Sequence, residues 1–219
     1  FIMTKPIVER HELSLYGIKT IMRHDYADPE IMGKIRSYID KSIKALDDFL
    51  TNVPGSEKFK SFCDVGCGED YVVEKMSKKF SEFFGLDLHI KSDRRYAGGP
   101  RTGIYKEDWY EMADTFGQTD VIFINHSMEH AANAFALMEQ LSKMQNRGNV
   151  LFVAVPDADY PWAYSMTSST THFSIFNEGF LQEILQRYGY RVCVEKRCFR
   201  EGAGELWAFC VKQVDGLPE

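Results

Sequence analysis

Acidic residues and glycines are grouped in one stretch of the chain in a way that suits ligand binding. The stretch Phe62–Tyr71 reads as a short apolar strand, a tight turn containing Gly66 and Gly68, and the start of a helix. Glycine carries no Cβ atom, so a ligand can approach the backbone N–H groups of such a turn closely. The pattern therefore predicts a cradle for a nucleotide-type ligand between a strand and a helix.

A second carboxylate, Asp87, ends the next apolar strand nineteen residues after Gly68. A carboxylate at this place can accept both hydrogen bonds of a ribose diol, a role that serves NAD and S-adenosylmethionine alike. On its own Asp87 would equally suit a helix-capping or solvated aspartate. Its position after the glycine turn favours ribose binding.

The acidic-x-Gly-x-Gly motif of Asp64-Val65-Gly66-Cys67-Gly68 resembles the first motif of class I S-adenosylmethionine-dependent methyltransferases. The resemblance covers about residues 60 to 212 and implies S-adenosyl-L-methionine as cofactor, with S-adenosyl-L-homocysteine as product. Asp64 suits a cofactor that carries an ammonium and a sulfonium. A dinucleotide fits less well, because Tyr71 stands where its fingerprint needs glycine or alanine.

Further cofactor contacts follow from the same resemblance. Asp108-Trp109 comes after the third strand, where the family places an acidic residue near the adenine amino group and an apolar side chain against the ring. An ordinary buried tryptophan is the alternative. Asn125 lies at the carboxyl edge of the sheet, where open α/β sheets bind ligands. The expected cofactor-binding residues are Asp64, Gly66, Cys67, Gly68, Asp87, Leu88, Asp108, Trp109 and Asn125.

Three histidines are the catalytic candidates: His126, His130 and His172. The run from Asn125 to His130 resembles the hydrophobic-Glu-His ending of many small-molecule methyltransferases of this class. We expect His126 at the cofactor's methionine end or the methyl-transfer site, whereas Glu129 and His130 either brace the loop or take part in the chemistry. His172 either acts as a general base or fixes the active-site loop.

Methyl transfer from a sulfonium needs positioning and exclusion of water, with a base only for some acceptors. The irregular segment 156–171 contains Tyr160, Trp162 and Tyr164, which either wall an acceptor pocket or anchor the loop. Cys63-x-x-x-Cys67 lacks the spacing of a zinc ribbon, and no metal site is expected.

Composition limits the partners and the location. The 219 residues carry a net charge of −6, so nucleic acid is an unlikely partner. The one basic cluster, Lys91, Arg94, Arg95 and Arg101, either touches an anionic group of the substrate or is a solvated loop. We expect no membrane span and no signal peptide. The five cysteines are expected to be reduced thiols of a cytoplasmic protein. The sequence carries no signal for the oligomeric state.

Strand-like and helix-like segments alternate from residue 60 onward, which predicts an α/β fold. We expect a Rossmann-like, seven-stranded, mostly parallel sheet with an antiparallel last strand and helices on both faces. Residues 1–57 would form an N-terminal arm and an extra helix beginning at Asp28-Pro29, and residues 58–219 the methyltransferase domain. The predicted strands are 61–65, 83–88, 103–105, 120–125, 149–155, 190–198 and 205–211, and the predicted core helices are 70–80, 131–144 and 178–188.

These features favour a methyltransferase acting on a small-molecule acceptor, at oxygen or nitrogen, such as a sugar or natural product. The alternatives are a protein or RNA methyltransferase and a non-catalytic cofactor-binding subunit. An NAD-dependent oxidoreductase is disfavoured by Tyr71. No Asn/Asp-Pro-Pro-Tyr/Phe sequence and no Pro-Cys dipeptide after the fourth strand are present, which argues against enzymes that methylate nucleic-acid amino groups or cytosine C5.

Overall fold

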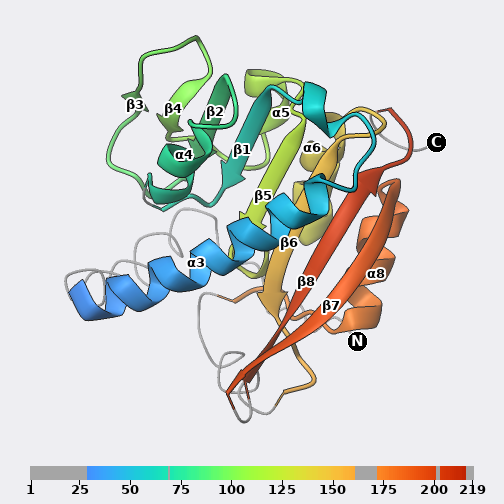
Figure 1. The fold of residues 1–219 in the computed structure, drawn as a ribbon. Helices are drawn as coiled ribbons and strands as arrows, with labels where there is room; N and C mark the ends of the chain where they lie inside the picture. Colours follow the sequence, from blue (N-terminus) through green and yellow to red (C-terminus); the bar gives the residue numbers. More distant parts are fainter. Residues whose placement is uncertain (1–28, 69, 161–171, 201–202, 216–219) are drawn as a thin grey trace.

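The computed structural model describes residues 29–68, 70–160, 172–200 and 203–215 (Figure 1). A sheet of eight strands in the order β3-β4-β2-β1-β5-β6-β8-β7 forms its centre. The strands are β1 Ser61–Val65, β2 Glu82–Leu86, β3 Arg94–Arg95, β4 Thr102–Tyr105, β5 Val121–Asn125, β6 Val150–Pro156, β7 Tyr190–Arg200 and β8 Ala203–Lys212. The predicted N-terminal arm, Trp162 and Tyr164 lie outside the described residues, and the domain division at residue 57 stays a prediction.

The expected Rossmann-like sheet is confirmed. Strands β4, β2, β1, β5 and β6 are neighbours in parallel, and β8 inserts antiparallel between β6 and β7. The eighth strand, β3, lies in a segment expected to be a loop and pairs antiparallel with β4. Gly103 permits this pairing, because a Cβ atom there would lie 2.1 Å from the carbonyl oxygen of Arg94.

Helices cover both faces of the sheet (Figure 1). Helices α3 and α4 lie on one face, where Ile43 and Leu46 of α3 pack with Val73 of α4. Helices α5, α6 and α8 lie on the other, where Leu137 and Leu181 belong to a second core cluster. Their bounds are α3 Pro29–Leu50, α4 Tyr71–Met76, α5 Met112–Phe116, α6 Ala134–Lys143 and α8 Glu178–Arg187, with 3-10 turns η1 Ser56–Lys58 and η2 Met128–His130.

Side-chain caps set the beginnings of two helices. Asn177 accepts a hydrogen bond from the Phe180 N–H at 2.8 Å and starts α8 at the predicted place. Helix α6 begins three residues later than predicted, because the Asn133 side chain accepts from the N–H groups of Phe135 and Ala136. The 3-10 turn η2, Met128–His130, precedes this cap and carries Glu129 and His130. Among the described residues, no helix combines the length and apolar character of a membrane span.

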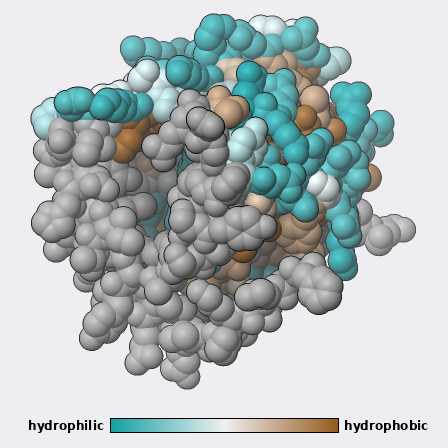
Figure 2. Space-filling view, turned by 90° about the horizontal axis from the view of Figure 1, so that it is seen from below, coloured by the Kyte–Doolittle hydropathy of each residue, from teal (hydrophilic) through white to brown (hydrophobic). Residues whose placement is uncertain are grey.

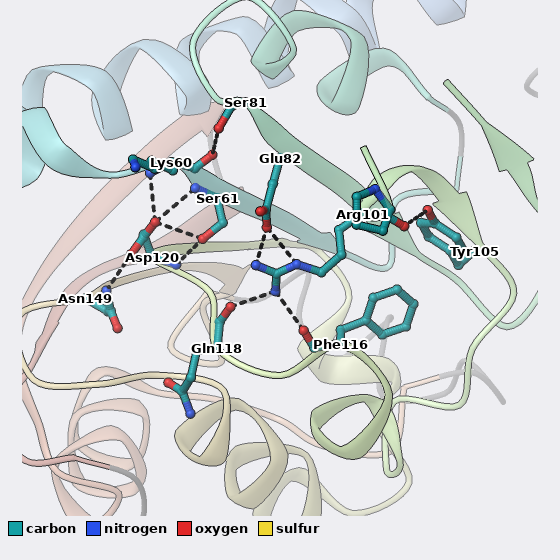
Figure 3. Close-up of polar contacts among 11 residues, drawn as sticks. Lys60, Ser61, Ser81, Glu82, Arg101, Tyr105, Phe116, Gln118, Asp120 and Asn149 are labelled. Atoms are coloured by element: carbon teal, nitrogen blue, oxygen red, sulfur yellow. Dashed lines mark hydrogen bonds and ion pairs between the residues drawn. The ribbon is translucent and has the colours of Figure 1, made fainter. Parts of the chain in front are cut away.

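The amino edge of the sheet is held by two ionic side chains (Figure 3). Asp120 accepts hydrogen bonds from the backbone N–H groups of Lys60 and Ser61 and from the Ser61 hydroxyl. Arg101 pairs with Glu82 and also donates to the carbonyl oxygens of residues 116 and 118. Arg101 of the predicted basic cluster is therefore a structural residue that ties β2 to the loop before β5.

A buried lysine ends the last strand at the same edge. Lys212 is fully buried, and its ammonium donates to the Ser142 hydroxyl and the Tyr188 carbonyl, each at 2.5 Å. Burial lowers the pKa of Lys212 from 10.5 to about 8, while nearby Asp215 acts weakly in the opposite direction. Since the charged form is penalised only in the folded state, stability should rise as pH climbs from about 8 towards 10.5.

Replacing this lysine by an apolar side chain of similar length should stabilise the fold. We expect Lys212→Met to raise the free energy of unfolding at pH 7 by about 1–2 kcal/mol. The gain should shrink between pH 8 and pH 10, because the wild-type ammonium is then neutralised. Urea unfolding of both proteins at pH 7 and pH 10 measures the difference. A wild-type protein more stable than Lys212→Met at pH 7 would contradict the prediction.

Candidate functional site

The glycine turn after β1 is fixed by the neighbouring strands. Gly66 and Gly68 have φ values of 81° and 54°, in the left-handed region that favours glycine. A Cβ atom at Gly66 would lie 2.1 Å from the Ser127 hydroxyl oxygen, so no larger residue fits there. The Gly68 N–H donates to the Asp87 carboxylate at 2.9 Å. This hydrogen bond joins the turn to the residue that follows β2.

Two buried carboxylates lie beside this turn. Asp64 is 3% exposed and Asp87 is 7% exposed. The backbone N–H groups of Gly68 and His89 donate to Asp87, but Asp64 has no hydrogen-bond or ion-pair partner in the described part of the chain. Burial and then the charge of Asp87 raise the pKa of Asp64 well above its ordinary range. A cation bound here would supply the missing positive partner.

Trp109 reaches the same turn from the loop after β4. Its ring packs so close to the turn that a Cβ atom on Gly66 would lie 3.2 Å from Cζ2, and its indole N–H is buried without a hydrogen-bond acceptor among the described residues. The neighbouring Asp108 accepts from the Tyr110 N–H at 2.9 Å. Trp109 therefore stands at the turn with a buried donor, rather than in the core away from it.

Two of the predicted cofactor residues differ in placement from the others. The Cys67 sulfur packs on the sheet, because a Cβ atom at Gly85 would lie 2.7 Å from it. Burial also raises the pKa of the Cys67 thiol, so the thiol stays protonated. Leu88 is 41% exposed beyond the end of β2. All five cysteines are free thiols, as expected.

His126 leaves β5 in a strained conformation. Its φ of 54° is the only positive φ of a non-glycine residue in the described chain, and such strain costs about 1–3 kcal/mol. Its Nδ1 lies 3.3 Å from Glu129, and its Nε2 lies 2.9 Å from Glu205. The Tyr38 hydroxyl of α3 donates its one proton to Glu205 at 2.6 Å and lies 3.3 Å from the Asn125 side-chain oxygen. This half-buried set of hydrogen bonds holds the imidazole ring in one orientation.

The partners of His126 fix its protonation state. Carboxylates only accept hydrogen bonds when ionised, so an imidazole between two of them donates from both nitrogens and carries a positive charge. Burial opposes that charge, but hydrogen bonds to Glu129 and Glu205 outweigh it and raise the pKa of His126 to about 10. At neutral pH His126 is therefore a cation that cannot act as a general base. Its expected place, at the cofactor's methionine end or at the methyl-transfer site, needs no general base and stays a prediction.

The other two predicted histidines come together. Their rings lie edge to face, with centroids 4.7 Å apart. The backbone N–H groups of Phe173 and Ser174 donate to the Glu129 carbonyl oxygen at 2.9 and 3.2 Å, which holds the His172 segment against η2. Burial and the proximity of His130 lower the pKa of His172, so its imidazole is neutral at pH 7. His130 and His172 thus form a second polar group at the carboxyl edge.

Several residues of the site had not been expected from the sequence. Tyr38, Ser127, Glu205 and Trp207 all contact predicted site residues or one another. Glu205 offered a local signal, because it is a charged residue at the start of an otherwise apolar strand, and it is only 5% exposed. Tyr38 offered none, since a tyrosine on an amphipathic helix is ordinary.

The remaining basic residues lie apart from this group. Arg94 pairs with Asp70 at the start of α4, and Lys91 and Arg95 are exposed. Tyr71 points towards α3, where its hydroxyl donates to Asp40 at 2.9 Å. Its bulk therefore lies against α3, and the steric argument against a dinucleotide is weaker than the sequence suggested.

The strands β1, β5 and β6 point their carboxyl ends downwards in Figure 1, and Figure 2 views the molecule from that side. Among the residues coloured by hydropathy in Figure 2, hydrophobic ones lie between hydrophilic ones. Asp64, the glycine turn, Asp87, Trp109 and the residues after β5 share this edge. The fold and site define a Rossmann-like α/β protein that binds a nucleotide-type cofactor.

Comparison with known proteins identifies the family within this class of cofactor-binding proteins. A family model described as "Methyltransferase domain" matches residues 35–195. The chain belongs to this methyltransferase family and is an enzyme. No curated protein matches the sequence.

Solved structures show the same fold. A SAM-dependent methyltransferase from Archaeoglobus fulgidus is 18% identical, with 81% of this chain and 94% of that chain covered and a TM-score of 0.60. Magnesium protoporphyrin IX methyltransferase from Synechocystis PCC 6803 is 15% identical, with 81% and 79% covered and a TM-score of 0.56. The CMeT domain of the citrinin polyketide synthase is 10% identical, with 87% and 59% covered and a TM-score of 0.60.

The charge on His126 can be tested directly. We expect the imidazole NMR resonances of His126 to stay in the protonated state until the pH approaches about 10. Glu205→Gln should lower this pKa by at least about one unit, because one of the two anionic partners is removed. Since the folded-state pKa is raised, His126 stabilises the fold fully below its unfolded pKa, and this contribution is lost as the pH rises towards 10. Titration of His126 near pH 6.5 in the wild type would contradict the assignment.

Proposed function

We propose that this enzyme transfers the methyl group of S-adenosylmethionine to oxygen or nitrogen of a small-molecule acceptor. The donor assignment is carried by one observation, the buried Asp64 carboxylate beside the glycine turn, which has no cationic partner among the described residues. The ammonium of S-adenosylmethionine would supply that partner, and the binding of a cation would favour the ionised form of Asp64. For the ribose and the adenine of the cofactor, the proposed partners are Asp87, Asp108 and Trp109.

Asp87 is proposed to bind the ribose. It already accepts from two backbone N–H groups, which orient its carboxylate at the end of β2, and each oxygen keeps capacity for a ribose hydroxyl. Asp108 and Trp109 are proposed to flank the adenine. The indole N–H of Trp109, which has no acceptor within the described chain, supports a ligand at this place, because such a buried donor costs about 1–3 kcal/mol.

The acceptor side is proposed to include Asn125, His130 and His172. Methyl transfer breaks the bond between sulfur and the methyl carbon, and its electron pair stays on sulfur to give S-adenosylhomocysteine. The new bond forms from a lone pair of the acceptor, whose proton must leave. His126 cannot take this proton because it is already protonated, whereas the neutral imidazole of His172 can.

A small acceptor is supported by three observations. The net charge is −6, and Arg94 and Arg101 of the basic cluster are paired with Asp70 and Glu82, which disfavours a polyanionic acceptor. Beside the site edge, the half-buried Tyr38 donates a hydrogen bond to the buried Glu205. Among the structural neighbours, one is a magnesium protoporphyrin IX methyltransferase and another is a polyketide synthase domain.

Cofactor binding provides the sharpest test of the donor. In calorimetry, the wild type should bind S-adenosylmethionine, and Asp87→Ala and Asp64→Asn should each weaken binding at least about tenfold, which corresponds to about 1.4 kcal/mol. Asp114→Asn, which changes an exposed aspartate on α5, is the matched control and should bind like the wild type. Absence of binding by the wild type, or equal binding by all the variants, would remove the assignment.

The acceptor class needs a separate measurement. With S-adenosylmethionine labelled on the methyl group and a fractionated cell extract, we expect label in acid-soluble small molecules. Label that precipitates with protein, or that ribonuclease releases, would instead favour a macromolecular acceptor. Label in no fraction, despite cofactor binding, would favour a cofactor-binding subunit without catalysis.

A further inference from the structure

Glu129, His130 and His172 bring one carboxylate and two imidazoles together at the carboxyl edge of the sheet. One potential ligand atom from each of the three side chains lies within 4.8 Å of the other two. The main chain fixes this arrangement, because Phe173 and Ser174 donate hydrogen bonds to the Glu129 carbonyl oxygen. The three side chains therefore converge through two segments that are anchored to one another.

The Glu129 carboxylate is incompletely paired. It is 2% exposed, and its Oε1 lies 3.3 Å from the Nδ1 of His126. Its Oε2 is buried and has no hydrogen-bond partner within the described residues. A buried polar atom without a partner costs about 1–3 kcal/mol, and more for a charged group. The edge-to-face contact of the two imidazole rings does not account for this atom, whereas a bound cation would.

We propose that Glu129, His130 and His172 bind a divalent transition metal ion, with Zn²⁺ as the best chemical match. Two imidazoles and one carboxylate form the ligand set of open three-residue zinc sites, which keep a further position for water or substrate. Mg²⁺ and Ca²⁺ prefer oxygen ligands and fit less well. Metal–ligand distances of about 2.0–2.2 Å put the ligand atoms of one ion about 3.5 Å apart. Side-chain rotations that bring the three ligand atoms roughly 1 Å closer together would therefore complete the site.

The contact of His126 with the Glu129 carboxylate also supports this assignment. Metal-binding side chains are commonly oriented by a hydrogen-bond partner on the side away from the metal. His126 holds one oxygen of Glu129 in this way and is itself held by Glu205 and Tyr38. Sequence spacing does not reveal the site, because His130 and His172 are 42 positions apart and follow different strands.

The role of the ion rests on the proposed function. An acceptor hydroxyl bound at its open position would lose its proton to solvent more readily, because the metal stabilises the oxygen anion. That oxygen would then attack the methyl carbon while the carbon–sulfur bond breaks. The inferred acceptor is therefore a small molecule with a hydroxyl group. His172 would serve as a metal ligand and not as a base, since its lone pair cannot do both.

Metal binding is tested without the cofactor. Protein stripped with a chelator is titrated with Zn²⁺ by calorimetry, in a Cys193→Ser/Cys198→Ser background that removes the two exposed thiols. We expect one ion per chain, and at least about tenfold weaker binding by His130→Ala and by His172→Ala. His89→Ala, an exposed histidine outside the cluster, should bind Zn²⁺ like the parent. No saturable binding, or equal binding by all the variants, would overturn the proposal.

Two further measurements guard against ambiguous outcomes. Glu129→Gln keeps the side-chain shape and should also weaken Zn²⁺ binding at least about tenfold, while circular dichroism reports whether each variant is folded. With Co²⁺ in the same Cys193→Ser/Cys198→Ser background, d–d bands without a thiolate charge-transfer band are expected, and a thiolate band would contradict the ligand set.

Binding of S-adenosylmethionine is measured on the same preparations. Zn²⁺ binding without cofactor binding would support the metal site and refute the proposed function. Cofactor binding without Zn²⁺ binding would refute the metal site and leave His172 as the candidate base.

Discussion

The imidazolium of His126, held between two buried carboxylates, is the interaction on which the candidate site depends. Glu129 comes from η2 and Glu205 from the start of β8, so the ring connects two segments that are distant in sequence. Removing the positive charge would leave two buried anions facing each other, which is far more costly than losing a surface ion pair. This stabilisation explains how a residue with positive φ is retained at the end of β5.

The antiparallel insertion of β8 makes that interaction possible. Because β8 runs against β6, its first residues reach the carboxyl ends of the parallel strands, where Glu205 pairs with Pro156 in register. A parallel strand in the same place would bring its last residues there instead. The site thus divides into an acidic end around Asp64 and Asp87 and a histidine end after β5, with the glycine turn and Ser127 in contact between them.

Local sequence patterns predicted the structural features that depend on residues close together in the sequence. The glycine turn, the parallel strands and the Asn177 cap each rest on residues within one turn or strand, and all are present in the structure, although β2 ends at Leu86 and not at residue 88. The patterns could not predict that Tyr38 would reach Glu205, 167 positions away. They also could not give the charge of His126, because that charge is set by the two carboxylates that the tertiary fold places beside it. Arg101 seemed available for a substrate because its partner Glu82 lies on another strand.

Helix α3 stands outside the alternation of strands and helices, yet its Tyr38 hydroxyl contacts Asn125 and Glu205 of the candidate site. Burial and the charge of Glu205 raise the pKa of Tyr38, so the hydroxyl remains a donor at physiological pH. The sheet can therefore keep the same cofactor cradle while a different preceding helix reshapes the opposite wall. In such an architecture, the choice of acceptor can diverge through a helix such as α3, which contains none of the cofactor-binding motifs.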